Sequence, residues 1–214
     1  MNFYKNYGKR AIGFVISAIV LLLIWPLLLI IAIIVKMDSK GPAIFVQDRL
    51  TLGGRVFKMY KFRTMIVNAE KQGTGAYSFG NDPRITKVGN ILRKLSLDEL
   101  LQLVNILKGD MAFIGPRPIL TYHPCKYEDY TEEEKTVFTV RPGISGWAQV
   151  NGRNSVDWEE RFKLNEWYVQ HVTLWLDIKI VFMTIAQVFS RKEIVIQGET
   201  AKSFKEKHQE RKAD

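Results

Sequence analysis

One long run without a charged side chain constrains this chain most. It extends from Ala11 to Val35 and is almost entirely apolar. A straight helix of that length measures roughly 37 Å, which is enough to cross the hydrocarbon core of a bilayer. A cleaved signal peptide fits poorly, because the run is too long and no small-residue cleavage site follows it. We therefore expect this run to lie in a membrane.

Pro26 and the charges beside the run argue against a simple crossing. Pro26 lies in its middle, where the ring clashes with the preceding turn and a backbone donor is lost, so each half is about half a bilayer long. Both flanks are basic, with Lys5, Lys9, Arg10, Lys36 and Lys40. The positive-inside rule places both flanks in the cytoplasm, which a kinked, re-entrant helix satisfies. A straight span stays open as an alternative, because spanning helices tolerate proline.

The charge balance indicates a polyanionic partner. The 214 residues carry a formal net charge of +9, which fits nucleic acid, anionic lipid headgroups or phosphorylated substrates equally well. Cys125 is the only cysteine, so no internal disulfide can form, as is typical of a reducing compartment. The histidines and the cysteine do not have the spacing of zinc ligands.

Beyond the apolar run, the pattern alternates loops with short amphipathic elements. Strands are expected at residues 43–46 and 56–63. Apolar residues at helical spacing predict helices at 97–108, ended by Gly109, and at 178–189. Loops are expected at residues 72–81, 114–118, 140–143 and 147–154.

The adjacent pair Asp98 and Glu99 admits a chemical and a structural interpretation. A carboxylate can attack phosphorus to form an acyl phosphate, and a second carboxylate can hold Mg²⁺ beside a diphosphate. The structural interpretation is a capping box, with Ser96 as N-cap and Glu99 at the third helical position. Judged on this pair alone, the capping box is the better explanation.

Several short sequence motifs, taken in order, favour the chemical interpretation of the acidic pair instead. Together they resemble the bacterial sugar transferases known as monotopic phosphoglycosyl transferases, in their minimal form, from the apolar run to about Arg191. The runs are YKFRTM at 60–65, DPRITKVG at 82–89, ILRKLSLDELLQ at 91–102, GDM at 109–111, GPRP at 115–118 and RPGISGWAQVNGRN at 141–154. Each run alone is weak, but the joint match is specific.

The resemblance implies a reaction and a set of residues. The family transfers a sugar phosphate from a UDP-sugar to undecaprenyl phosphate and releases UMP, as the first membrane step of polysaccharide or glycoconjugate assembly. By position, Asp98 matches the nucleophile that carries a covalent phosphosugar, and Glu99 matches the glutamate associated with Mg²⁺. Residues matching the substrate-binding positions are Lys61, Arg93, Arg117, Arg153 and Asp177.

The resemblance also implies a mostly helical α+β fold. Residues 1–36 would form the re-entrant membrane helix with basic flanks, 37–191 a compact cytoplasmic catalytic domain with interfacial amphipathic helices and little strand, and 192–214 a polar tail. Both termini would lie at the cytoplasmic face of the bacterial cell membrane. The chain departs from the family pattern at Trp25, where serine is common, and at Asn165, where aspartate is usual; Glu166 is the candidate substitute.

Other functions remain as alternatives at this point. A membrane-tethered nucleic-acid-binding protein would explain the charge but not the 115–118 loop or the acidic pair, so no nucleic acid is expected as partner. A non-catalytic interfacial scaffold would explain the amphipathic helices. A glycosyltransferase that releases UDP is the nearest chemical rival. The sugar, the pathway and the oligomeric state, a homodimer included, stay open.

Overall fold

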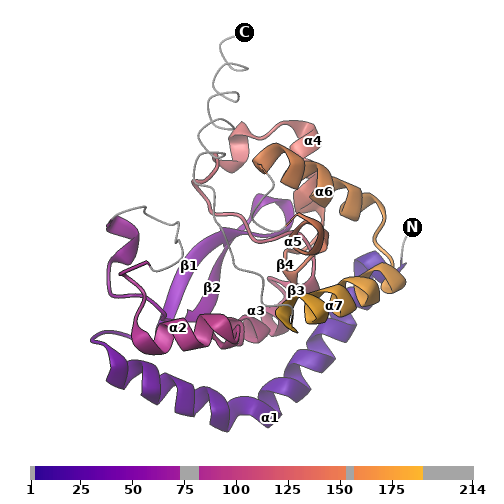
Figure 1. Ribbon diagram of the computed structural model, residues 1–214. Coiled ribbons are helices and arrows are strands. Elements are labelled where there is room, and N and C mark those ends of the chain that lie inside the picture. Colours follow the sequence, from indigo (N-terminus) through magenta and orange to yellow (C-terminus); the bar gives the residue numbers. More distant parts are fainter. Residues whose placement is uncertain (1–2, 73–81, 153–156, 190–214) are drawn as a thin grey trace.

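The computed structural model describes residues 3–72, 82–152 and 157–189. Three features expected from the sequence lie outside these residues: most of the loop at 72–81, Arg153 with Asn154, and the tail at 192–214. Within them, the fold is mostly helical with two small sheets, as the sequence predicted (Figure 1).

The apolar run forms a single long helix that bends. After a π-helical turn, η1 (Tyr4–Gly8), helix α1 extends over Lys9–Asp38 with Pro26 inside it. Both arms of α1 rise from the bend toward the rest of the chain (Figure 1). The proline removes one backbone hydrogen bond, and here the helix kinks at mid-length without ending.

The two faces of α1 differ in what they contact. Ile31 and Val35 are buried against β2, α2 and the turn before α3. Leu22 is 75% exposed and Leu23 is 72% exposed. Among the described residues, one helix, Tyr4–Asp38, is long and apolar enough to cross a membrane. An apolar surface of this size is stable in lipid and not in water, so the protein associates with a membrane through α1.

Two small sheets form the frame of the part of the chain that follows α1. Strands β1 (Ile44–Leu50) and β2 (Val56–Phe62) form an antiparallel hairpin. The sequence predicted strands at 43–46 and 56–63 but not their pairing, and β1 continues four residues beyond the predicted end. Strand β3 (Ala112–Ile114) pairs in parallel with β4 (Gly143–Ser145). The sequence predicted only loops around this second pair, because a strand of three residues has too little alternation to be recognised.

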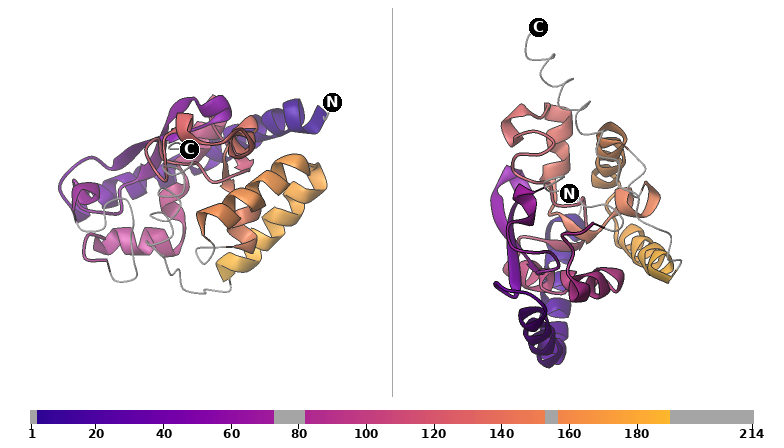
Figure 2. Two further views of the ribbon diagram at one scale, coloured as in Figure 1. Left: turned by 90° about the horizontal axis from the view of Figure 1, so that it is seen from above. Right: turned by 60° about the vertical axis from the view of Figure 1, so that its left-hand side comes forward.

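Short helices connect and cover these sheets (Figure 2). Their bounds are α2 (Lys87–Lys94), η4 (Leu97–Glu99), α3 (Gln102–Lys108), α4 (Glu132–Lys135), α5 (Trp147–Asn151), α6 (Trp158–Gln170) and α7 (Leu174–Phe189). Shorter 3₁₀ turns are η2 (Leu52–Gly54), η3 (Ala69–Lys71), η5 (Tyr127–Asp129) and η6 (Thr136–Thr139). Helix α5 occupies residues for which the sequence predicted a loop.

The predicted helix at 97–108 is in fact two elements, and the capping box is wrong. Ser96 has a left-handed backbone with φ of 54° and its side chain caps nothing, so η4 starts after a sharp turn. Helix α3 follows and ends at Gly109, whose φ of 91° favours glycine, as predicted. Its polar side chain Asn105 is fully buried and bonds Lys58 O and Tyr60 N of β2, so this face meets the hairpin instead of water.

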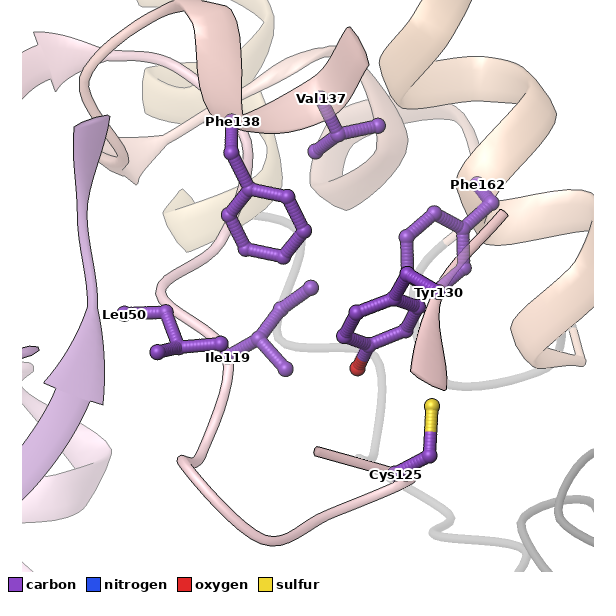
Figure 3. Packing of buried hydrophobic residues seen from close by; sticks show 7 residues of the cluster. All are labelled: Leu50, Ile119, Cys125, Tyr130, Val137, Phe138 and Phe162. Atoms are coloured by element: carbon purple, nitrogen blue, oxygen red, sulfur yellow. The ribbon is translucent and has the colours of Figure 1, made fainter. Parts of the chain in front are cut away.

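An apolar core holds the 119–138 segment against β1 and α6 (Figure 3). Phe138 lies over Leu50 and Ile119, and Tyr130 packs beside Phe162. Cys125 is a free, buried member of the same cluster. This core fixes the loop that precedes it, which carries Arg117.

Helix α7 has the amphipathic form expected of an interfacial helix. Its start lies against the start of α1, where Asp177 accepts a hydrogen bond from Lys9. Its inner residue Ile180 is fully buried, whereas Trp175 is 78% exposed and Phe182 is 68% exposed. Since these apolar side chains face outward next to the membrane helix, they suit the headgroup region.

Candidate active site

Three elements bring the predicted residues together. Lys61 lies near the end of β2, Glu99 lies on η4, and Arg117 follows β3. The Lys61 Nζ donates a hydrogen bond to Glu99 Oε1 at 2.6 Å. These three side chains line one open pocket, together with Arg49 and Gln102.

The turn between α2 and α3 sets the position of the acidic pair. Because Ser96 has a left-handed backbone, the chain reverses sharply and η4 begins close to the end of α2. Asp98 is buried as a result. Arg93, in the last turn of α2, donates from Nε to Thr64 Oγ1 at 2.9 Å and acts electrostatically on Asp98.

Helix α2 can lie this close to the hairpin because of one glycine. A Cβ on Gly89 would come within 2.1 Å of the Thr64 carbonyl oxygen, so only glycine permits the contact. Thr86 caps the helix by accepting a hydrogen bond from the Gly89 N–H. The contact brings Arg93 to Thr64 and to the acidic pair.

The environment raises the pKa of the Asp98 carboxyl group. Burial is the main cause, and the neighbouring charge of Glu99 adds to it. The positive charges of Lys61 and Arg93 oppose the increase without cancelling it. A carboxylate with a raised pKa is less stabilised as an anion, and this makes it a better nucleophile once it is ionised.

Glu99 has the opposite shift. Burial alone would raise its pKa, but the charges of Lys61 and Arg117 and the hydrogen bond from Lys61 together lower it. Glu99 is therefore the stably ionised member of the pair. Adjacent carboxyl groups whose pKa values move apart are typical of sites that assign them different roles.

Arg49 belongs to this site, and the sequence did not indicate it. It lies on β1 and donates from Nη1 to Pro118 O at 2.8 Å and from Nη2 to Gln47 Oε1 at 2.6 Å. Burial and the neighbouring charge of Arg117 lower its pKa to about 10. No local motif marks this residue; only the pairing of β1 with β2 and the contact with the 118–120 segment bring it here.

The resulting pocket is positive around one carboxylate. Arg49, Lys61 and Arg117 outnumber Glu99 among the charged lining residues. Paired prolines flank Arg117 and restrict its backbone, while the guanidinium itself is exposed. Such a pocket suits a multiply charged anion, and arginine offers bidentate hydrogen bonds to phosphate oxygens.

Comparison with known proteins identifies the family of this chain. The family model for bacterial sugar transferases matches residues 4–191. The chain belongs to this family. A UDP-glucose:undecaprenyl-phosphate glucose-1-phosphate transferase of Escherichia coli is 44% identical over 190 residues, which are 86% of this chain and 40% of that protein.

Two further relatives differ in how much of their length this chain covers, and one of them is named for galactose. The undecaprenyl-phosphate galactose phosphotransferase of Salmonella typhimurium is 39% identical over 201 residues, 87% of this chain and 41% of that protein. The uncharacterized sugar transferase EpsL of Bacillus subtilis is 43% identical over 166 residues, 77% of this chain and 76% of that protein. This sugar transferase therefore spans about two fifths of the length of the Escherichia coli and Salmonella typhimurium relatives.

In this sugar transferase, Asp177 bonds to groups outside the pocket. Its Oδ2 accepts hydrogen bonds from Tyr4 and Lys9, and its Oδ1 accepts one from Tyr168 at 2.6 Å. Lys9 also donates to Ile114 O at 3.0 Å, at the end of β3. Asp177 thus connects α7, the start of α1 and the strand before Arg117, which is a positioning role.

Arg153, which matches the family pattern, and Asn165, which departs from it, differ in what the structure describes. Arg153 lies outside the described residues, so its predicted role stays a prediction. Asn165 is buried on α6, and its Oδ1 has no hydrogen-bond partner in the described part of the chain. Glu166 is half-buried and accepts a hydrogen bond from Gln170, and its substitution for the family's aspartate stays a prediction.

The carboxylates of the sugar transferase fit a magnesium ion that the substrate helps to hold. Among the described residues, no group of three or more histidine, cysteine, aspartate or glutamate side chains could hold a metal. Mg²⁺ commonly uses only one or two carboxylates and completes its shell with water and substrate phosphates. Glu99, ionised and beside Asp98, meets that requirement.

Proposed function

We propose that this protein transfers a sugar 1-phosphate from a UDP-sugar to undecaprenyl phosphate and releases UMP. The reaction is the first membrane step in assembling a polysaccharide or glycoconjugate. The observation that carries the proposal is the ion pair of Lys61 and Glu99 in a pocket that Arg49 and Arg117 also line. Asp98 is the adjacent residue on η4, and its pKa shifts in the opposite direction from that of Glu99. The names of the Escherichia coli and Salmonella typhimurium relatives agree with this acceptor.

Asp98 is the nucleophile in this proposal. Its carboxylate oxygen attacks the phosphorus that carries the sugar, and the bond from that phosphorus to the bridging oxygen breaks. UMP leaves with the bridging oxygen, and an aspartyl phosphosugar remains. A phosphate oxygen of undecaprenyl phosphate then attacks the same phosphorus, which frees Asp98 and yields the lipid diphosphate sugar.

The basic side chains hold the substrate phosphates during both steps. Arg117 and Arg49 offer N–H donors to the diphosphate, and Arg93 balances charge near Asp98. Arg153 is assigned the same type of contact from its position in the motif. Because donor and acceptor occupy the site in turn, their like charges never meet there.

Glu99 would hold Mg²⁺, with Asp98 next to it. When bound, the ion neutralises negative charge on the diphosphate and on the departing UMP. Lys61 keeps Glu99 ionised through its hydrogen bond, so that the carboxylate is available as a ligand.

The membrane segment places this chemistry at the surface of the bilayer. We propose that α1 is re-entrant and that both termini lie on the cytoplasmic side. Asn2→Cys and Asp214→Cys variants in intact cells test this with a membrane-impermeant thiol reagent. Both should react only after the membrane is permeabilised, and labelling of either from outside would exclude the re-entrant topology.

A half-reaction tests the covalent route. The protein is incubated with a UDP-sugar and Mg²⁺ but no acceptor, and the peptide that contains Asp98 is examined by mass spectrometry. We expect a phosphosugar adduct and a stoichiometric release of UMP, both absent in Asp98→Asn. An active Asp98→Asn variant without any adduct in wild type would refute the proposal, and UDP as product would indicate a glycosyltransferase.

The donor sugar is found with a panel of UDP-sugars. Each is supplied with undecaprenyl phosphate, and the initial rate of UMP release is measured. The relatives carry different sugars in their names, so similarity does not select one. A single UDP-sugar that is turned over much faster than the others would identify the donor.

A further inference from the structure

A second pocket lies beside the start of α1. It has a volume of about 280 Å³ and shares no lining residue with the candidate active site. Lys5, Lys9 and Arg10 line it from the N-terminal segment, and Arg141 lines it from the segment before β4. Ile106 and Met111 supply apolar wall. It is smaller than most pockets for drug-sized ligands, so it suits a compact charged group.

Arg10 and Arg141 both donate hydrogen bonds to the end of α3, which partly explains why they lie here. Arg10 donates to Ile106 O at 2.6 Å and to Leu107 O at 2.9 Å, while Arg141 donates from Nε to Gly109 O at 2.8 Å. Both therefore satisfy carbonyl groups at the end of α3. A helix end offers only about half an elementary negative charge to these two cations.

The remaining positive charge is only partly balanced by a carboxylate, that of Asp110. In the described part of the chain, neither Arg10 nor Arg141 makes a salt bridge. Arg55 is paired with the nearby Asp110 at 3.2 Å. Burial, followed by repulsion from Arg10 and Arg55, lowers the pKa of Arg141, and attraction to Asp110 opposes this shift without cancelling it. Each guanidinium also keeps N–H donors that the helix carbonyls do not use.

The pocket lies next to the start of the uncharged run, where the lipid headgroups are expected. Arg10 immediately precedes the uncharged run that begins at Ala11, so the pocket is where α1 enters the membrane. Phosphates of anionic lipids are concentrated at this level. A basic pocket with an apolar wall, open at that depth, matches a phosphate attached to acyl chains better than a soluble polyanion.

We propose that this pocket binds the phosphodiester headgroup of an anionic phospholipid through Arg10 and Arg141. The bound lipid would hold the N-terminal arm of α1 at a defined depth. This site is separate from the proposed catalytic reaction, and its test involves no turnover.

Native mass spectrometry of the full chain in detergent tests the proposal. Phosphatidylglycerol or phosphatidylcholine is titrated, and the first binding constant of each is compared. We expect one phosphatidylglycerol to bind more tightly than phosphatidylcholine. Arg141→Gln should weaken it about tenfold, the effect of losing one charged hydrogen-bonding group. Arg141→Lys should retain part of the affinity, because it keeps the charge without the fork.

Lys163→Gln is the matched control, because it removes one exposed positive charge from α6. It should bind phosphatidylglycerol as the wild type does. Circular dichroism checks that each variant is folded, and the comparison of the two lipids on wild type needs no variant. Equal affinity for the two lipids, or equal affinity of Arg141→Gln and wild type, would overturn the proposal.

Two competitors separate the sources of the phosphate. Glycerol 3-phosphate should not displace phosphatidylglycerol at comparable concentration; displacement would mean that a soluble phosphate occupies the pocket. Undecaprenyl phosphate should likewise leave the bound phosphatidylglycerol in place. Displacement by it that depends on Arg141 would assign the pocket to the acceptor and overturn the phospholipid assignment.

Discussion

The Nζ of Lys61 lies 2.6 Å from Oε1 of Glu99, although the two residues come from a strand and from a turn that are distant in sequence. The contact is largely shielded from water, with side-chain exposures of 17% and 26%. It keeps Glu99 ionised next to Asp98, whose pKa moves the other way. This ion pair therefore separates the roles of two adjacent carboxyl groups.

Replacing Lys61 by methionine should remove the difference in pKa between Asp98 and Glu99. Lys61→Met removes the positive charge that lowers the Glu99 pKa and leaves a carboxylate without its partner. We expect the rate of UMP release to fall by at least about tenfold, since a buried charged hydrogen bond contributes roughly 1.5–3 kcal/mol. Lys58→Met, at an exposed position of the same strand, is the control and should leave the rate unchanged.

Replacing Glu99 by glutamine tests the metal. Glu99→Gln keeps the size of the side chain but removes the ionised ligand, so both half-reactions should slow severely. Any residual rate should require a higher Mg²⁺ concentration than wild type does. Titrating MgCl₂ against initial UMP release measures this, and an unchanged Mg²⁺ dependence would argue against Glu99 as ligand.

Arg117 should not tolerate lysine. Arg117→Lys keeps the charge and loses the planar pair of N–H donors, so kcat/KM should fall by about tenfold or more. Arg153→Lys should act in the same direction. Arg55→Lys is the matched control, because Arg55 is 67% exposed and lies outside the pocket lining. Near-normal kinetics in both site variants would remove these arginines from substrate binding.

Asp177 should matter first for stability. Asp177→Asn leaves Lys9 buried without its charged partner, which typically costs about 3–5 kcal/mol. Adding Lys9→Met should recover much of the loss, because the unpaired charge is then gone. Thermal unfolding in detergent measures both variants. A stable Asp177→Asn protein with no activity would indicate substrate contact instead of positioning.

The buried pair of Asp82 and Arg84 should make stability depend on pH. Hydrogen bonds from Arg84 lower the pKa of Asp82 despite its burial. A lowered carboxyl pKa stabilises the fold above the unfolded value of about 4, and this stability is lost as the pH falls through the folded value. Asp82→Asn should therefore be less stable than wild type from about pH 5 to 7, with the difference shrinking below about pH 4. A difference in melting temperature that does not change with pH would contradict this.

At the acidic pair, the local sequence predicted the residues of interest but not their backbone conformation. The order of the motifs identified Asp98 and Glu99, but the pattern at Ser96 also predicted a capping box and one continuous helix. The structure replaces both with a left-handed turn at Ser96, because contacts of η4 with the hairpin and α2 outweigh the local preference. The sequence did not predict that Arg49 lines the pocket, since its position there depends on its hydrogen bond to Pro118.

By itself, the sequence determined the elements whose cause is local. The uncharged run with Pro26 specified a kinked membrane helix, the strand residues at 56–63 specified β2, and Gly109 specified the end of α3. Only the tertiary structure decided which side chains meet: Lys61 with Glu99, and Asp177 with Lys9 and Tyr168. Periodicity and turn chemistry act over a few residues, whereas these contacts join residues brought together by packing of the whole chain, which no local pattern encodes.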